Sequence, residues 1–353
     1  MMTKNESSVL LIYTGGTIGM IENPDTGALE SFNFLHLLDN VPELKRLGSN
    51  ISTIQFDPPI DSSDMSPDKW GELVRIIADN YDYFDGFVIL HGTDTMSFTA
   101  SALSFMLEGL NKPVILTGSQ LPIGVLRTDG KENLITAIEI AAAKEGGRPI
   151  VPEVCILFEN LLLRGNRTKK TNAEKFNAFN SYNYPPLARV GIHIRYDDHV
   201  IQYPSPDSTL VPHFSIDPNI VVLKIFPGIT RDVVRSILHI PNLKGVVLET
   251  FGSGNAMTHQ WFLSDMKEAI DSGIVVVNIS QCTGGSVQMD LYETGNKLSY
   301  TGIISGYDMT TEAALAKLMF LFGQQNSHEQ IKAKLKRSLC GEMHIPNYNA
   351  QAH

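Results

Sequence analysis

The sequence Val9-Leu10-Leu11-Ile12-Tyr13 runs directly into Thr14-Gly15-Gly16-Thr17-Ile18-Gly19, and this junction decides the fold class. A short, uninterrupted apolar run is typical of a strand that is covered on both faces, as in a parallel sheet. Glycines directly after such a strand let the backbone approach a ligand closely and adopt conformations that other residues avoid. We therefore expect a buried parallel strand with a ligand-binding loop at its carboxyl end.

The same pattern of short apolar runs recurs along the chain, with segments of helical period between them. Such alternation of buried strands and amphipathic helices predicts an α/β fold with a mainly parallel sheet flanked by helices. The expected N-terminal strands are 9–13, 86–90, 113–116 and 154–158, and the expected helices are 67–80, 95–110 and 133–144. Further along, the expected strands are 220–225, 246–248 and 274–278, and the expected helices are 260–271 and 310–322.

A chain of 353 residues fits two domains better than one. The stretch 195–218 has no sustained apolar period and carries four prolines, which is typical of a connecting segment. We expect a larger N-terminal domain at 1–195, a linker at 196–218 and a smaller C-terminal α/β domain at 219–353.

The charge balance argues against polyanionic partners, because 38 acidic residues outnumber 28 basic ones and give a net charge of -10. Nucleic acids and anionic membranes select clustered Lys and Arg. The polar start of the chain and the absence of a long apolar run predict a cytoplasmic protein without a membrane span. The three cysteines have no metal-binding spacing, and Cys155 lies in an expected strand, so we expect it to be buried and unreactive. We expect no metal or other cofactor.

Three expected strands are followed by segments rich in hydroxyl side chains: Thr14 to Gly19, His91-Gly92-Thr93-Asp94-Thr95 and Thr117-Gly118-Ser119-Gln120. Because parallel strands end at one edge of a sheet, these hydroxyls are expected to gather there. A phosphate-binding loop is the first alternative, but the first motif has neither the Gly-x-Gly-x-x-Gly spacing nor a Gly-Lys-Ser/Thr ending. Ordinary turns are the second alternative for each motif taken singly.

A threonine hydroxyl needs a base within hydrogen-bonding reach to act as a nucleophile. His91 is the histidine at a strand end, and we interpret it as a structural, hydrogen-bonded residue. The other source of a base is the basic stretch 164–172, where a lysine beside other cations or partly desolvated loses proton affinity. A solvated basic loop remains the alternative interpretation of this stretch.

The first two motifs together resemble the signatures of the bacterial-type L-asparaginase family. The resemblance covers nearly the whole chain, includes Asp61-Ser62-Ser63-Asp64-Met65, and is closest to the cytoplasmic type I enzymes. It implies an amidohydrolase that converts L-asparagine to L-aspartate and ammonia through a threonine nucleophile and a β-aspartyl ester. It also implies a small-molecule substrate and a homodimer or homotetramer.

The resemblance also implies roles for individual residues. Thr17 is placed as the nucleophile, Thr14 as a structural residue, and Thr93, Asp94 and Lys170 as a second catalytic cluster. Because Lys169 is adjacent, the choice of Lys170 rests on the alignment and not on chemistry. Backbone N–H groups near Thr93 are expected to stabilise the oxyanion. The implied substrate-binding residues are Ser62, Ser63, Thr93, Asp94, Ser119 and Asn255, of which Asn255 is expected either to reach a neighbouring subunit's site or to be a turn residue.

The segment 20–30 is turn-rich and is expected to act as a lid. Relatives often carry a tyrosine in this segment, where Ala28 stands in this chain. A glutaminase-leaning amidase, an amidotransferase subunit that releases ammonia, and a non-catalytic amino-acid sensor are the alternatives. The presence of Thr17, Thr93 and Lys170 argues against the sensor.

Overall fold

The structure is a computed structural model that describes residues 7–22, 29–31, 41–205, 207–289 and 293–346. The chain separates into two compact units, Met1–Phe214 and Ser215–His353. The segment 196–218, where the sequence predicts a linker, spans the boundary between them. The tip of the expected lid, including Ala28, lies outside the described residues.

The first unit is built on an eight-stranded sheet with the order β15-β14-β11-β10-β7-β5-β1-β4. Its parallel part contains β10 (Val154–Phe158), β7 (Val114–Thr117), β5 (Gly86–Leu90), β1 (Ser8–Tyr13) and β4 (Asn50–Gln55). Its antiparallel part contains β11 (Leu161–Arg164), β14 (Ala188–Arg189) and β15 (Arg195–Tyr196). The predicted mainly parallel sheet is therefore confirmed.

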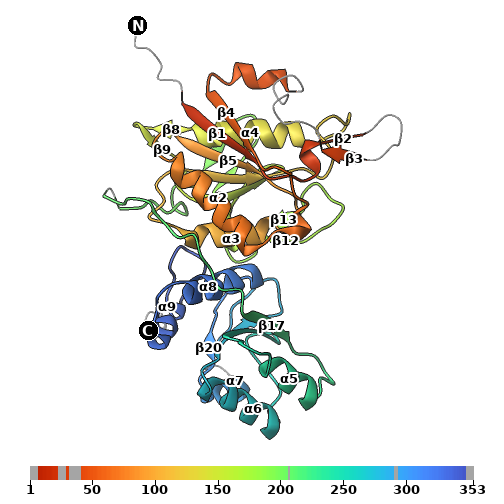
Figure 1. Cartoon of the computed structure of the whole chain (residues 1–353), viewed down its shortest axis with the longest axis vertical. Helices are drawn as coiled ribbons and strands as arrows, with labels where there is room; N and C mark the ends of the chain where they lie inside the picture. The colour runs from red at the N-terminus through yellow and green to blue at the C-terminus, as the bar shows by residue number, and fades with distance from the viewer. Residues whose placement is uncertain (1–6, 23–28, 32–40, 206, 290–292, 347–353) are drawn as a thin grey trace, which may run out of the picture. The chain divides into compact units, whose positions relative to one another are not determined.

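Three helices cover the central strands: α2 (Pro67–Asp79), α3 (Met96–Met106) and α4 (Gly130–Ala142). Figure 1 shows α2 and α3 on one side of the sheet and α4 on the other. Alternate strand residues point to opposite faces, and Leu11, Val88 and Ile115 pack with α4 in one fully buried cluster. Both faces of these strands are thus buried, which explains their uninterrupted apolar sequences.

Helix α2 shows why a local sequence becomes a helix here. Pro67 occupies the first turn, where its missing N–H leaves no intrahelical bond unmade, and Trp70, Leu73, Val74 and Ile77 form the buried stripe. The indole Nε1 of Trp70 donates to Oγ1 of Thr99 on α3 at 2.9 Å, so the two helices are joined by a buried polar contact.

The second unit holds a four-stranded parallel sheet with the order β17-β18-β19-β20. The strands are β17 (Ile220–Lys224), β18 (Gly245–Thr250), β19 (Val275–Ser280) and β20 (Ile304–Ser305). The helices are α5 (Arg231–Leu238), α6 (Gln260–Asp271), α7 (Glu293–Ser299), α8 (Thr311–Gly323) and α9 (His328–Leu335). This unit confirms the predicted smaller α/β domain.

The second unit also buries an ion pair between Lys317 of α8 and Glu342, whose side chains are both fully inaccessible at a distance of 2.6 Å. Burial alone would raise the pKa of Glu342, but the Lys317 ammonium holds it below its ordinary value. Backbone N–H groups of Leu339 and Cys340 donate to the same carboxylate. The ion pair therefore holds the segment after α9 against α8.

Candidate active site

The carboxyl ends of β1, β5 and β7 meet at one edge of the large sheet. The register pairs Tyr13 with Leu90, and Leu90 with Thr117, so the three hydroxyl-rich motifs begin at the same level. Strand β1 lies between β5 and β4, and the chain visits β4 before it crosses back to β5. This reversal of strand order is the position where open α/β sheets bind ligands.

The first motif is held against the second by glycines. Gly16 has φ +91°, and a Cβ on it would lie 2.6 Å from the Cα of Gly92. Thr17 follows Gly16 as the half-buried first residue of a 3₁₀ turn, η1 (Thr17–Gly19). Thr17 and Thr93 are therefore each one residue away from the same backbone contact.

Thr14 and Thr17 occupy different environments although they share one motif. Thr14 is buried, and both its N–H and its hydroxyl donate to the carbonyl oxygen of Leu90 at 3.0 Å. This contact ties β1 to β5, in agreement with a structural role for Thr14. The hydroxyl of Thr17 has no comparable bond to the strand ends among the described contacts.

The structure brings together Thr93, Asp94 and Lys170. The Nζ atom of Lys170 donates to Oγ1 of Thr93 at 2.8 Å and to Oδ1 of Asp94 at 2.7 Å. The Lys170 side chain is 18% exposed and the Asp94 side chain 68% exposed, so the lysine is enclosed while its carboxylate partner faces solvent. An amine in contact with both a hydroxyl and a carboxylate forms the kind of arrangement that activates a hydroxyl or a water.

Lys170 belongs to β12 (Lys169–Lys170), which pairs with β13 (Phe179–Asn180). Successive strand residues point to opposite sides, so Lys169 and Lys170 cannot both face Thr93. In the described contacts it is Lys170 that reaches Thr93 and Asp94, the residue that the resemblance places there.

The two serines after β4 differ in their surroundings. Ser62 is buried, its carbonyl oxygen accepts from Oγ1 of Thr95 at 2.6 Å, and a Cβ on Gly92 would lie 2.4 Å from its Oγ. Ser63 is exposed, and its N–H and hydroxyl both donate to Oδ1 of Asp61. The Ser63 backbone N–H and then its hydroxyl lower the pKa of Asp61. Ser62 thus adjoins the second motif directly.

Ser119 and Asn255 are placed less directly. Ser119 is buried, and its hydroxyl donates to the carbonyl oxygen of Leu121 at 2.6 Å. Asn255 belongs to the second unit, where its backbone pairs with Phe251 around a tight turn. The turn interpretation of Asn255 fits this local structure.

His91 is fully buried beside this cluster. Its Nδ1 contacts the carbonyl oxygen of Gly92 at 2.7 Å, and its Nε2 contacts Oγ1 of Thr99 at 2.9 Å. Burial lowers the pKa of His91 to about 4, so the ring is neutral at neutral pH. Both ring nitrogens are engaged, as expected of a structural histidine.

Cys155 is also buried, and burial raises the pKa of its thiol, as expected of an unreactive strand residue.

Gln120 is a residue of this site to which the sequence interpretation gave no role. Its Oε1 lies 3.5 Å from Oγ1 of Thr93, and its Nε2 donates to the carbonyl oxygens of Ala173 and Lys175. It therefore links the third motif to Thr93 and to the segment after β12. Its position in a strand-end motif was the available signal.

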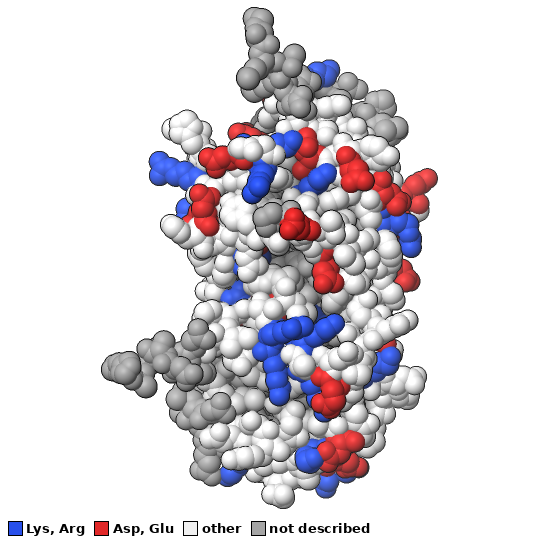
Figure 2. Space-filling model, turned by 90° about the vertical axis from the view of Figure 1, so that its left-hand side faces the viewer, with Lys and Arg blue, Asp and Glu red and all other residues white. Residues whose placement is uncertain are grey.

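The described residues show neither a membrane-spanning helix nor a cluster of side chains that could hold a metal. Neither unit contains, in its described part, a helix long and apolar enough to cross a bilayer. The same residues hold no group of three or more His, Cys, Asp or Glu side chains that could bind a metal ion. On the face in Figure 2, Lys and Arg side chains are interspersed with Asp and Glu side chains.

Comparison with known proteins decides the family. Residues 8–202 match the family model "Asparaginase, N-terminal", and residues 219–335 match "Glutaminase/Asparaginase C-terminal domain". The chain belongs to the asparaginase family. The resemblance stated from the sequence is therefore confirmed.

Several asparaginases are similar to this chain along nearly its whole length. L-asparaginase 1 of Escherichia coli K12 is 46% identical over 96% of this chain and 98% of its own. The crystal structure of L-asparaginase I from Vibrio cholerae has a TM-score of 0.87 and 43% identity, and the match covers 96% of this chain and all of that one. The crystal structure of a probable cytoplasmic L-asparaginase from Campylobacter jejuni has a TM-score of 0.78 and 26% identity, and the match covers 94% of this chain and all of that one.

Proposed function

We infer that the protein hydrolyses the side-chain amide of L-asparagine to give L-aspartate and ammonia. It is an amidohydrolase of the asparaginase family, and L-asparagine is its small-molecule substrate. The observation that carries the chemical proposal is the contact of Lys170 Nζ with both Thr93 and Asp94 beside the loop of Thr17. The L-asparaginases at 46% and 43% identity favour this reading over the glutaminase-leaning, amidotransferase and sensor alternatives.

We assign the first step to Thr17. Its Oγ1 attacks the amide carbon, the carbon–nitrogen bond breaks, and the proton of the hydroxyl leaves on ammonia. Backbone N–H groups near Thr93 stabilise the negative oxygen of the tetrahedral intermediate. The product of this step is a β-aspartyl ester of Thr17. The half-buried position of Thr17 next to the Gly16–Gly92 contact supports this assignment.

We assign the second step to Thr93, Lys170 and Asp94. A water adds to the ester carbon, and the Lys170 amine, acting through the Thr93 hydroxyl, accepts the proton of that water. Collapse of the intermediate releases L-aspartate and returns a proton to Thr17. The distances of 2.8 Å and 2.7 Å from Nζ support a hydrogen-bonded proton path, and Asp94 balances the lysine charge when the amine is protonated.

Substrate binding requires that both charges of the amino acid are paired. We propose that Ser62 and Ser63 bind the α-carboxylate and α-amino group together with Asp94, whose carboxylate pairs with the ammonium. Ser119 contributes through the loop that its hydroxyl bond to Leu121 shapes. Asn255 is proposed to act on a neighbouring subunit's site in a homodimer or homotetramer. The exposure of Asp94 supports its access to substrate.

We further propose a cytoplasmic location. The similarity to the probable cytoplasmic L-asparaginase from Campylobacter jejuni supports this proposal.

The function is tested by measuring ammonia release from L-asparagine, L-glutamine and D-asparagine side by side. We expect the largest kcat/KM for L-asparagine. One methylene changes binding by only about 1 to 3 kcal/mol, so some turnover of L-glutamine is compatible with the proposal. Faster turnover of L-glutamine, or release of ammonia from none of the three, would contradict it.

A further inference from the structure

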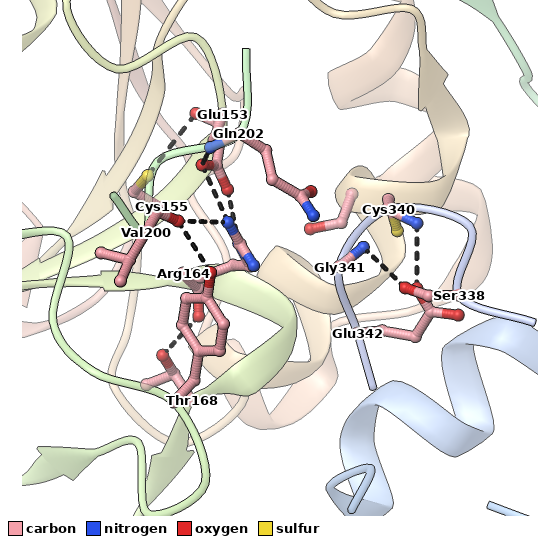
Figure 3. A network of polar contacts seen from close by, with 12 residues as sticks. Glu153, Cys155, Arg164, Thr168, Val200, Gln202, Ser338, Cys340, Gly341 and Glu342 are labelled. Carbon is pink, nitrogen blue, oxygen red and sulfur yellow. Dashed lines mark hydrogen bonds and ion pairs between the residues drawn. The ribbon is translucent and has the colours of Figure 1, made fainter. Parts of the chain in front are cut away.

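A buried ion pair lies at the start of the segment 165–170, which leads to Lys170 and is called the lysine loop below. Neither of its two residues is assigned a part in the reaction. Arg164 ends β11, and its guanidinium makes two bonds to the carboxylate of Glu153, from Nε at 2.6 Å and from Nη2 at 3.1 Å. The Arg164 side chain is 2% exposed and that of Glu153 9%. Figure 3 shows the pair with the backbone groups that surround it. A planar, two-bond contact of this kind fixes direction as well as distance.

The ion pair also joins separate parts of the chain. Nη2 of Arg164 donates to the carbonyl oxygen of Val200, and the N–H of Gln202 donates to Oε1 of Glu153. The ring of Tyr184 lies under the guanidinium, with 4.2 Å between the Arg164 Cζ and the ring centroid. The end of β11 is therefore held from several sides.

Thr168 connects Arg164, at the end of β11, to strand β12, which carries Lys170. Its side chain is fully buried, and its hydroxyl donates to the carbonyl oxygen of Arg164 at 2.7 Å (Figure 3). That bond closes the 3₁₀ turn η5 (Gly165–Arg167), whose first residue packs closely on α3: a Cβ on Gly165 would lie 2.9 Å from the Cβ of Ala100. Helix α3 begins directly after Thr93 to Thr95.

The distance along the chain from Thr168 to Lys170 is only two residues. One end of the lysine loop is thus set against the helix that follows Thr93, and the other end is set by the pairing of Lys170 with Phe179. A lysine carries its amine on a flexible four-carbon stem, so the direction of its strand limits where the amine can lie. A displacement of about 1 Å in such a group can cost about a hundredfold in rate.

We propose that Thr168 is a positioning residue for Lys170, anchored through its hydroxyl bond to the backbone of the buried Arg164–Glu153 pair. This proposal rests on the proposed role of Lys170 in the reaction. Thr168 touches neither substrate nor reacting atoms in the mechanism assigned above; it acts by keeping Nζ within reach of Thr93 and Asp94.

Three variants test the proposal in the full-length enzyme. Thr168→Val keeps the shape and removes the hydroxyl, Thr168→Ser keeps the hydroxyl, and Thr301→Val removes an equivalent buried bond, from Thr301 to the carbonyl oxygen of Leu298, in the other unit. We expect Thr168→Val to lower kcat by about ten- to hundredfold with KM changed less than about threefold. Thr168→Ser should recover most of the lost kcat. Thr301→Val should shift the melting temperature by a similar amount and keep normal kcat.

A double-mutant cycle separates positioning from general stability. If Thr168 acts through Lys170, then adding Thr168→Val to Lys170→Met should lower the residual rate no further. Normal kcat in Thr168→Val, failure of serine to recover activity, or a full additional loss in the Lys170→Met background would each overturn the positioning role. Normal kcat in Lys170→Met alone would instead contradict the proposed function of the lysine, so the two failures can be told apart.

Discussion

The backbone of Gly16 lies directly against that of Gly92, so that a Cβ at residue 16 would come within 2.6 Å of both the Cα and the N of Gly92. Cβ atoms in proteins essentially never lie this close to backbone atoms, so a side chain at residue 16 would force one of the two loops to shift. The contact joins the loop of Thr17 to the loop of Thr93, and it depends on the absence of a side chain at residue 16.

This contact predicts that Gly16→Ala separates the two loops. We expect kcat/KM to fall at least about a hundredfold, because the nucleophile and the second cluster would move apart by a large fraction of an ångström. Gly48→Ala is the matched control: Gly48 also has a positive φ, of +65°, but an added Cβ meets nothing within 4 Å. The control should lose stability and keep normal turnover. Equal activity losses in both variants would show that backbone strain, and not the contact, is the cause.

The two proposed catalytic threonines predict that Thr17→Ala and Thr93→Ala each lower kcat about a thousandfold or more while the fold is kept. Each change removes a hydroxyl and one methyl group from a half-buried side chain, so little packing is lost. Thr14→Val serves for comparison, because Thr14 donates its hydroxyl to Leu90 within the sheet. It should cost about 1 kcal/mol of stability and affect kcat far less. Steady-state kinetics with circular dichroism checks this, and near-normal kcat in either alanine variant would remove that threonine from the mechanism.

The contacts of Lys170 predict that substitution of Lys170 lowers turnover far more than substitution of the adjacent Lys169. Lys170→Met keeps the apolar stem and removes the amine that contacts Thr93 and Asp94, so we expect turnover to fall about a thousandfold. Lys169→Met changes a side chain on the other side of β12 and should be mild. Kinetics of the two purified variants decides between them: a larger loss at residue 169 would mean that the wrong lysine has been assigned.

The fold was predictable where burial is complete. Strands β5 and β10 were expected at their observed bounds, because both faces are covered and their sequences are uninterrupted apolar runs. Strand β4 was not expected, since it reads Asn-Ile-Ser-Thr-Ile-Gln and lies at the sheet edge, where burial is partial. Helix α5 was not expected because it is only eight residues long and buries few of them. Short or half-exposed elements depend on tertiary packing that the local sequence does not display.

The site was predictable to the level of motifs. Parallel strands that end at one edge were enough to bring Thr17, Thr93 and Ser119 to the same place. The contact of Lys170 with Thr93 joins residues 77 positions apart. It depends on the turn after β11 and on the packing of Gly165 against α3, neither of which has a local signal. The contribution of Gln120 was missed for the same reason, because its partners lie more than fifty positions further along the chain.

The neutral, buried His91 predicts how stability depends on pH. Burial lowers its pKa from 6.5 to about 4, so between these values the unfolded chain binds a proton that the folded chain does not. Above about pH 6.5 the histidine is neutral in both states and does not lower the free energy of unfolding. As the pH falls from 6.5 to 4, the free energy of unfolding decreases by up to about 3 kcal/mol from this group, since one pKa unit corresponds to about 1.4 kcal/mol. His91→Gln keeps a donor for the Gly92 carbonyl and an acceptor for Thr99 but cannot be protonated. We expect its melting temperature to fall less between pH 7.5 and pH 4.5 than that of the wild type, whereas His193→Gln, at an exposed position, should follow the wild type. Identical pH dependence in the wild type and His91→Gln would show that the histidine is already protonated in the folded protein or exposed to solvent, contrary to the hydrogen-bonding arrangement observed.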